Sequence, residues 1–288
     1  MEKFCDLHTH SVYSDGTCTP GELVNLAEEI GLGAIALCDH NTVSGLPEFL
    51  AAAESREVAA IPGVEISTDY QGTELHILGL FLPPESYGPI TEKLESMVAE
   101  KEWSNRCLTE KLTQAGMPLD YGRIKETSPD CQVNRAVIGA EMVRLGYVNS
   151  VKEAFEQYLS VKRGFYIPPS RPDALAIIRF LKSQGAVAVL AHPFLNLKQE
   201  ADLCSFLDQA VPAGLDGMEV RYPLFDAETT QLAESVAKDF GLLPSGGSDF
   251  HGSNKPDISL GTGKGNVSVP ISWCYQLQQR KYSGEMGK

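Results

Sequence analysis

The sequence predicts an α/β barrel that carries an inserted, all-helical subdomain. Short apolar runs of strand length alternate with amphipathic stretches of helical length, a pattern typical of parallel strands joined by crossover helices. The chain has 288 residues, enough for one such barrel and an insertion. The alternation stops between about residues 89 and 168, where only helical patterns are found. We therefore expect a barrel domain made of residues 1–88 and 169–288, interrupted by a helical insertion at residues 89–168.

Seven apolar runs are the expected strands of the barrel. They lie at residues 4–7, 34–38, 58–67, 74–81, 186–191, 217–220 and 242–247. Amphipathic stretches that close on a glycine, as helix C-termini often do, predict helices at residues 20–31, 171–185 and 227–241. The insertion is expected to contain helices at residues 90–116, 120–126, 134–145 and 151–159. After Gly252 we expect an ordered surface return followed by a loose tail.

Composition narrows the class of protein. Hydrophobic residues make up 43% of the chain and charged residues 22%, the balance of a globular protein. A net charge of −14 argues against double-stranded nucleic acid or membranes as partners, because such binding depends on Lys and Arg contacts. The seven cysteines are scattered with no Cys-x-x-Cys pair, which favours reduced thiols. With no signal-peptide pattern and no apolar run of membrane-spanning length, we expect a cytoplasmic protein.

Every histidine of the chain lies inside a predicted strand or just after one. The six are His8, His10, His40, His76, His192 and His251. The C-terminal ends of parallel barrel strands meet on one face, which is where active sites are built. Side chains two residues apart on a strand point the same way, so His8 and His10 can approach one ion together. We therefore expect the histidines to converge.

Three carboxylates accompany the histidines: Asp15, Glu65 and Asp249. Taken singly, His76 would be a core histidine and Asp15 a turn residue. Nine such side chains together exceed what one ion can hold, so two or three clustered divalent ions are expected. Three divalent ions among three carboxylates would leave a net charge of about +3, which attracts phosphate and favours phosphoester hydrolysis. Asp6 and Asp39 are expected to orient imidazoles from outside the site, or to be turn and cap residues.

Six stretches carry these residues: DLHTHSVYSDG at 6–16, LCDHN at 37–41, PGVEIS at 62–67, ELHILG at 74–79, LAHP at 190–193 and GSDFHG at 247–252. In sequence and in order they resemble the motifs of the PHP (polymerase and histidinol phosphatase) family. The resemblance implies a distorted (β/α)7, TIM-like barrel. It also implies a metal-dependent phosphoesterase with two or three divalent ions, which would be Mn, Fe, Zn or Mg.

The resemblance further implies how the ions share their ligands. One ion would be held by His8, His10, Glu65 and Asp249; a second by Glu65, His76 and His192; a third by Asp15, His40 and His251. A hydroxide bridging the metals would be the nucleophile. Asp15, Glu65, Asp249 and His251 are expected to be catalytic as well as metal-binding.

Residues 134–169 resemble a PHP subgroup of small phosphoesterases that act on 5′- or 3′-phosphorylated nucleotides. In that subgroup the helical insertion covers the active site and offers a basic residue to the substrate. Arg135 is the best match for this residue, and Lys162 is a second candidate for substrate binding. Each has a plain alternative as a solvated charge at a helix end. The chain departs from the subgroup where Ile138 or a neighbour replaces a histidine, and where no Gly-Arg follows the LAHP stretch.

The leading hypothesis is therefore a hydrolase that removes phosphate from small phosphorylated metabolites, above all nucleotides (5′-monophosphates or 3′,5′-bisphosphates), or trims short 5′-phosphorylated oligonucleotides. A histidinol-phosphate phosphatase is the alternative within this class. An amidohydrolase-type deaminase also uses His-x-His on a first barrel strand, but no lysine stands at a strand end to bridge its metals. A metal- or nucleotide-binding protein without turnover is a third hypothesis, against which the complete ligand set argues.

Overall fold

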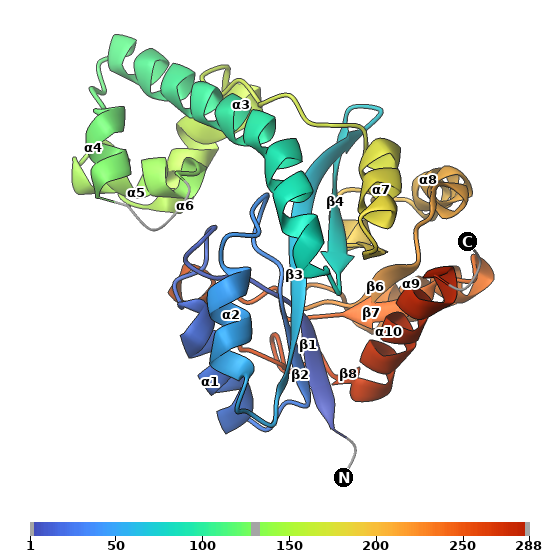
Figure 1. Ribbon diagram of the computed structural model, residues 1–288. Coiled ribbons are helices and arrows are strands. Elements are labelled where there is room, and N and C mark those ends of the chain that lie inside the picture. The colour runs from blue at the N-terminus through green and yellow to red at the C-terminus, as the bar shows by residue number, and fades with distance from the viewer. Residues whose placement is uncertain (1–2, 128–132, 286–288) are drawn as a thin grey trace. The chain divides into compact units, whose positions relative to one another are not determined.

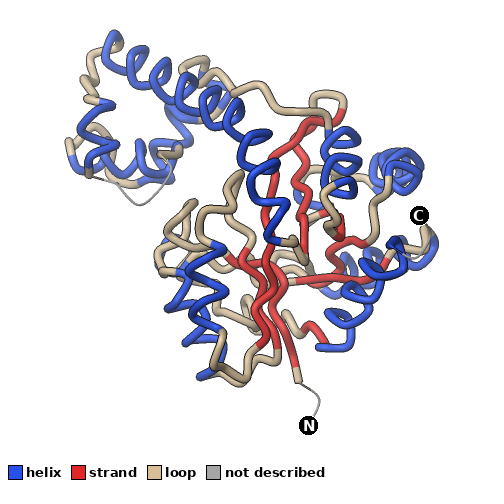
Figure 2. The backbone as a smooth tube through the Cα atoms, in the orientation of Figure 1, coloured by secondary structure: helices blue, strands red, loops and turns tan. Residues whose placement is uncertain are grey.

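The strands of the protein form one eight-stranded sheet (Figures 1 and 2). The computed structural model describes residues 3–127 and 133–285. Neighbouring strands follow the order β7-β6-β5-β4-β3-β2-β1-β8. Their bounds are β1 Phe4–Thr9, β2 Ala34–Leu37, β3 Ala59–Tyr70, β4 Thr73–Leu80, β5 Val187–Leu190, β6 Gly217–Arg221, β7 Leu243–Gly246 and β8 Val269–Pro270. The seven predicted runs correspond to β1 through β7.

The sheet curls into a barrel because the chain that follows β7 bonds to β1. The backbone N–H of Asp249 donates to the carbonyl of His8 at 2.9 Å, and the N–H of His10 donates to the carbonyl of Phe250 at 3.0 Å. β8 lies outside this ring and pairs antiparallel with the first residues of β1. The prediction of a distorted, TIM-like barrel built on seven strands is confirmed.

One strand runs against the predicted direction. β4 pairs antiparallel with both β3 and β5, so the expectation of parallel strands throughout the barrel is wrong. The cause is local, because only Gln71 and Gly72 join β3 to β4. Both residues have positive φ, +53° and +84°, as a tight hairpin turn requires. A parallel pair would need a crossover of about a dozen residues. The reversal brings the start of β4 to the edge of the sheet at which β3 ends.

Helices flank the strands of the barrel. In Figure 1, α1 and α2 lie on one side of the sheet and α9 and α10 lie on the other. The predicted helices at residues 20–31, 171–185 and 227–241 are confirmed, and the glycine that ends each has a φ between 67° and 77°. The bounds are α1 Pro20–Glu29, α2 Leu46–Ala53, α7 Ala174–Ser183, α8 Glu200–Ala213, α9 Ala227–Asp239 and α10 Ile271–Glu285. Short 3₁₀ turns lie at Pro84–Ser86, Pro193–Leu195 and Gly252–Asn254.

The ordered return expected after Gly252 continues into a helix that was not predicted, and residues 286–288 lie outside the described residues. This helix is α10, whose first turn is held by the N–H of Ile271 donating to the carbonyl of Lys3 at 3.0 Å. Cys274 and Leu277 are buried against the apolar cluster of the barrel. Ile271, Cys274 and Leu277 recur at helical spacing, and together they cover β1, β5 and β7.

The described chain separates into two compact units. The barrel unit comprises residues 1–91 and 171–288, and the helical unit comprises residues 92–170. α3 Tyr87–Gln114 begins in the barrel unit and continues into the helical unit. The helical unit also contains α4 Tyr121–Glu126, α5 Arg135–Arg144 and α6 Val151–Ala154, followed by a π-helical turn Phe155–Leu159 and a 3₁₀ turn Val161–Arg163. The helical unit has an apolar core of its own, which includes Leu108, Ile138 and Met142.

The cysteines and the hydropathy of the helices can be compared with the sequence-based predictions. Six of the seven cysteines are free thiols, in agreement with the prediction, and the seventh, Cys131, lies outside the described residues. Within residues 3–127 and 133–285, no helix is long and apolar enough to cross a membrane.

Candidate metal centre

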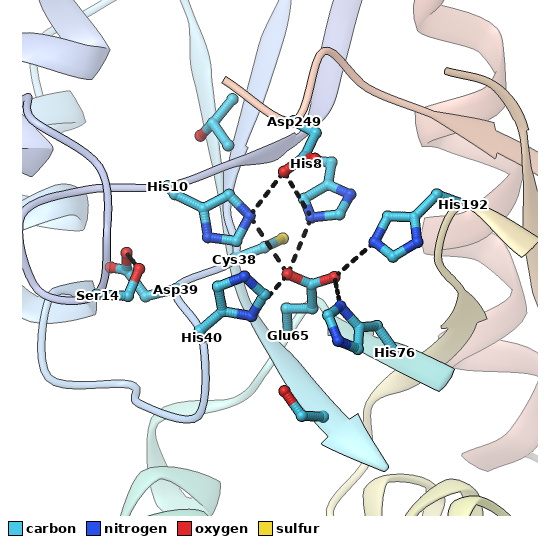
Figure 3. Close-up of polar contacts among 12 residues, drawn as sticks. His8, His10, Ser14, Cys38, Asp39, His40, Glu65, His76, His192 and Asp249 are labelled. Atoms are coloured by element: carbon cyan, nitrogen blue, oxygen red, sulfur yellow. Dashed lines mark hydrogen bonds and ion pairs between the residues drawn. The ribbon is translucent and has the colours of Figure 1, made fainter. Parts of the chain in front are cut away.

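All nine predicted ligands belong to the barrel unit, and Glu65 lies at their centre (Figure 3). Five imidazoles surround its carboxylate. Glu65 Oε1 lies 2.8 Å from Nδ1 of His76 and 3.0 Å from Nε2 of His192. Glu65 Oε2 lies 3.0 Å from Nδ1 of His40, and 3.3 Å from Nε2 of both His8 and His10. The convergence expected from the strand ends is therefore present in the structure.

The remaining ligands join this group through Asp249 and Asp15. Asp249 Oδ1 lies 3.1 Å from Nε2 of His10 and 3.4 Å from Nδ1 of His251. Asp15 Oδ1 lies 3.1 Å from Nε2 of His251, and Asp15 Oδ2 lies 3.9 Å from Nε2 of His40. Groups of three or four side chains with ligand atoms close enough for one ion overlap here, and His8, His10, His40 and Glu65 each belong to two of them. The sequence did not predict this overlap for any of the three histidines.

The backbone turns sharply where the ligands leave their strands. His192 follows β5 with a φ of +28°, and Asp249 follows β7 with a φ of +51°. Residues that are not glycine seldom adopt positive φ, and such strain persists only where the surroundings enforce it. Here the N–H of His192 donates to Glu219 Oε2 at 2.7 Å and the N–H of Asp249 donates to the carbonyl of His8. These hydrogen bonds hold the strained turns in place and aim both side chains at the centre.

The reversed strand explains the position of His76. In a parallel strand a ligand is expected at the C-terminal end, yet His76 lies near the beginning of β4. Because β4 is antiparallel to β3, His76 pairs with Ser67 and lies beyond Glu65 toward the end of β3. The beginning of β4 and the ends of β1, β2 and β5 therefore meet at one place.

Several ligand atoms are buried and lack hydrogen-bond partners among the described residues. They are His8 Nε2, both ring nitrogens of His10, His40 Nδ1 and Glu65 Oε2. A buried polar atom without a partner costs roughly 1–3 kcal/mol, so such groups are rare in folded proteins. All of them lie around Glu65, where imidazole nitrogens face carboxylate oxygens at 3.0–3.3 Å without hydrogen-bond geometry. Cations bound among these atoms would satisfy them, so the residues fit divalent metal ions.

The electrostatics of the cluster also favour cations. Burial alone would raise the pKa of Glu65, yet the imidazoles of His40 and His8 hold that pKa well below its usual range. Burial would lower the pKa of His8, but the carboxylates of Glu219, Glu65 and Asp249 outweigh it and raise the pKa well above normal. The site thus keeps its carboxylates ionised away from water and leaves negative charge that positive ions can balance.

Glu219 is a functional residue that the sequence analysis missed. It is fully buried, and its Oε1 lies 3.0 Å from Nδ1 of His8. When the imidazole is neutral, as a metal ligand must be, an Nδ1–H that donates to Glu219 selects the tautomer whose Nε2 carries a lone pair toward Glu65 and Asp249. The other oxygen accepts from the N–H of His192, so one carboxylate orients two ligands. A carboxylate inside the apolar run GMEV was the signal available in the sequence.

Tyr222 and Lys255 were also missed, and both bind Asp249. The Tyr222 hydroxyl donates to Asp249 Oδ2 at 2.8 Å, and Lys255 Nζ lies 2.6 Å from the same oxygen. The second carboxylate oxygen, Oδ1, is left to face the histidines. Tyr222 directly follows β6, a position that could have been read as a strand-end residue, whereas Lys255 lies in a loop with no motif to mark it.

Asp6 and Asp39 hold backbone turns. Asp39 accepts hydrogen bonds from the N–H and hydroxyl of Ser11, both at 2.7 Å, and from the hydroxyl of Ser14 at 2.6 Å. Asp6 accepts from the N–H and hydroxyl of Ser248 and from the N–H of Gly261. Asp6 and Asp39 were expected either to orient imidazoles or to serve as turn and cap residues. These contacts agree with the second role.

An open pocket of about 240 Å³ leads to the cluster. His40, Glu65, His76, His192 and Asp249 form part of its wall. The remainder of the wall is formed by Glu74, Leu195, Asn196, Tyr222 and Lys255. A volume of this size admits a small anionic group while keeping it in contact with the ligands.

The two predicted substrate-binding residues belong to the helical unit. Arg135 begins α5, and its guanidinium lies over the rings of Tyr166 and Phe155, at 4.3 and 5.5 Å from their centroids. Lys162 lies in the 3₁₀ turn after the π-helical turn, and it is exposed. Their role in substrate binding stays a prediction.

Comparison with known proteins identifies the family. Residues 6–167 match the PHP domain, and this stretch covers more than half of the chain. The chain belongs to the PHP family. It is 34% identical to the 5′-3′ exoribonuclease of Haemophilus influenzae over 87% of this chain and 91% of that protein. It is 26% identical to the 3′,5′-nucleoside bisphosphate phosphatase of Chromobacterium violaceum over 89% of this chain and 90% of that protein.

A solved structure agrees with both the fold and the family. The crystal structure of a candidate metal-dependent phosphoesterase from Bifidobacterium adolescentis superimposes with a TM-score of 0.84 and 28% sequence identity, covering 96% of each chain. Together with the family membership and the histidine and carboxylate clusters, this makes the chain a PHP-type, metal-dependent hydrolase of phosphoric ester bonds.

Replacement of Glu219 by glutamine should weaken metal binding. Each oxygen of Glu219 accepts one hydrogen bond, and the NH₂ group of a glutamine amide can only donate. In the variant this NH₂ group therefore faces another donor, either Nδ1–H of His8 or the N–H of His192, and the His8 tautomer is no longer fixed. We expect metal affinity to fall by about 10–100-fold, as measured by competition with a chromogenic chelator. Glu234→Gln, which alters a partly exposed ion pair with Arg221, is the control and should bind metal as the wild type does. Equal affinity in Glu219→Gln and the control would contradict the role of Glu219.

Proposed function

We propose that this PHP-family enzyme removes phosphate from nucleotides, either 5′-monophosphates or 3′,5′-bisphosphates, or trims short 5′-phosphorylated oligonucleotides. The observation that carries the proposal is the cluster around Glu65, in which Glu65 Oε2 and the buried ring nitrogens that face it from His8, His10 and His40 have no hydrogen bonds. Divalent ions held there would lower the pKa of bound water towards about 7 and offset the charge of a phosphoryl group. The mixed histidine and carboxylate set suits Mn, Fe, Zn or Mg.

Two or three ions are proposed, with the nine ligands divided among them. One ion would take His8, His10, Glu65 and Asp249; a second Glu65, His76 and His192; a third Asp15, His40 and His251. Sharing of Glu65 between two ions is supported by its two oxygens, since Oε1 faces His76 and His192 while Oε2 faces His8, His10 and also His40. A carboxylate that faces two sets of imidazoles with its two oxygens suits a bridging ligand.

The protein groups around the cluster would position the substrate. Asp249 is held by Tyr222 and Lys255, and Glu65 lies within β3 among five imidazoles, so neither carboxylate needs to reorganise when a phosphate enters. Lys255 lines the same pocket and has a charged, partly exposed Nζ, which can donate to a phosphate oxygen. Asp15 and His251, which are 3.1 Å apart, contribute the remaining catalytic pair of the proposal.

The choice of nucleotides is supported by the relatives. The Haemophilus influenzae and Chromobacterium violaceum proteins are named as an exoribonuclease and a nucleoside bisphosphate phosphatase, and each aligns along most of its length. Both names describe phosphoester bonds next to a nucleoside. In this proposal Arg135 and Lys162 bind the substrate, and the helical insertion covers the active site.

The proposal is tested by a phosphate-release screen on metal-loaded protein. Nucleoside 5′-monophosphates, 3′,5′-bisphosphates, 5′-phosphorylated oligonucleotides and histidinol phosphate are compared by kcat/KM. Asp249→Ala should lower kcat by about 1000-fold or more, because it removes a ligand and leaves Lys255 unpaired. Asp239→Ala, an exposed position of α9, is the control and should keep full activity. Absence of phosphate release from every nucleotide by the wild type would refute the proposal.

Removal of Asp15 should remove one ion and spare the others. Asp15 lies 3.1 Å from His251, 3.8 Å from His10 and 3.9 Å from His40, whereas Glu65 does not lie among its ion-pair partners. We expect Asp15→Ala to bind one metal fewer per chain than the wild type, as counted by inductively coupled plasma mass spectrometry. The Asp239→Ala protein again serves as the control. A metal content that drops to zero in Asp15→Ala would show that the ligands do not divide in this way.

Arg135 should contribute to substrate binding more than to turnover. With Arg135→Ala we expect KM for the preferred nucleotide to rise about 10-fold while kcat changes less than about twofold. Because the guanidinium also stacks on Tyr166, the melting temperature of the variant is measured beside that of Arg144→Ala, a control from the same helix. An unchanged KM in a stable Arg135→Ala protein would remove Arg135 from the substrate site.

A further inference from the structure

A second pocket lies directly beside the pocket of the metal centre. It also measures about 240 Å³, and both pockets are lined by Tyr222, Asp249 and Lys255. These three side chains form the hydrogen-bonded group in which Tyr222 and Lys255 bind Asp249 Oδ2. Because they share these three side chains, the two pockets are neighbours.

The second pocket has a different chemical character. Its walls include the apolar side chains of Pro223, Leu224, Pro256 and Ile258, whereas the first pocket is lined largely by histidines and carboxylates. Leu224 is 56% exposed, a large fraction for a leucine so close to a catalytic centre. An uncovered apolar wall next to a polar site suits the apolar part of a substrate.

The walls are held in place before any ligand arrives. One wall follows β6 and the other follows β7, and Asn266 joins them by donating from Nδ2 to the carbonyls of Pro223 and Phe225, both at 3.1 Å. A tight turn at Ser259 and Gly263 closes the second loop through two backbone hydrogen bonds of 2.8 Å. The pocket therefore does not depend on a bound ligand for its shape.

The charged side chains around the pocket balance one another. Lys255 and Lys264 contribute two positive charges and Asp249 and Asp257 two negative charges, and Lys255 is paired with Asp249, so Lys264 is the cation of the lining that lies beyond this pair. A substrate anchored by phosphate at the metal ions and passing Lys255 would reach this pocket next. Apolar walls with a lysine beside them match a heterocyclic base attached to a sugar phosphate.

We propose that the pocket between Leu224 and Ile258 binds the nucleoside part of the substrate whose phosphate is hydrolysed at the metal centre. The inference rests on the proposed function and adds the site that distinguishes nucleotides from other phosphate esters. Contacts with the phosphate position any phosphate ester, whereas contacts in this pocket strengthen the binding of only those esters that carry a base.

The test compares two esters that differ in the base alone, adenosine 5′-monophosphate and ribose 5-phosphate. Leu224→Ser removes apolar wall without adding charge, and Ile30→Ser is the matched control because Ile30 is 53% exposed on the same unit. We expect Leu224→Ser to lower kcat/KM by about 10-fold for adenosine 5′-monophosphate and by less than twofold for ribose 5-phosphate. Ile30→Ser should change neither. An equal loss on both esters, or no loss on the nucleotide, would overturn the proposal.

Failure of the proposed function is distinguished by binding measurements. If the wild type hydrolyses neither ester, the binding of both to metal-loaded wild type and Leu224→Ser protein is measured by isothermal titration calorimetry. Tighter binding of adenosine 5′-monophosphate than of ribose 5-phosphate, lost in Leu224→Ser, would support the pocket even without turnover. Equal binding of the two esters to the wild type would refute it.

Discussion

The buried carboxylate of Glu65, surrounded by five imidazoles, is the interaction on which the site depends. An ionised carboxylate removed from water is strongly unfavourable unless charges or hydrogen-bond donors compensate it. Here the compensation comes from side chains on β1, β4 and the ends of β2 and β5, all of which approach the same two oxygens. The position of Glu65 in the middle of β3 therefore ties five strands to one point. The orphaned nitrogens around it are the physical reason why metal ions belong there.

A ring of supporting contacts keeps these groups aimed at one another. Glu219 fixes His8 through its ring and His192 through its backbone, while Tyr222 and Lys255 fix one oxygen of Asp249. These contacts come from β6 and from the loop after β7, on the far side of the sheet order from β3. Closure of the barrel between β7 and β1 is what brings the two groups together. The catalytic geometry and the barrel topology are thus consequences of the same hydrogen bonds.

Family membership and site chemistry describe the reaction, whereas the choice of substrate depends on surfaces beside the metals. The cluster itself is suited to many phosphate esters because it meets only the phosphoryl group. Selection among esters requires contacts with the leaving group, and the apolar pocket that shares Tyr222 and Lys255 with the metal pocket offers such contacts. In this view the loops after β6 and β7 serve both to orient Asp249 and to receive the substrate.

The sequence by itself determined the seven strands, the helices that end on glycines, and the convergence of six histidines with Asp15, Glu65 and Asp249. These features depend on local patterns, namely apolar periodicity, turn residues and the position of polar side chains at strand ends. The structure corrected the direction of β4 by showing where the strands end: the predicted runs left residues 68–73 between them, whereas β3 and β4 are joined by a two-residue turn that only a hairpin can use. It also decided the roles of Glu219, Tyr222 and Lys255 and the packing of α10, because each depends on contacts between residues far apart in the chain.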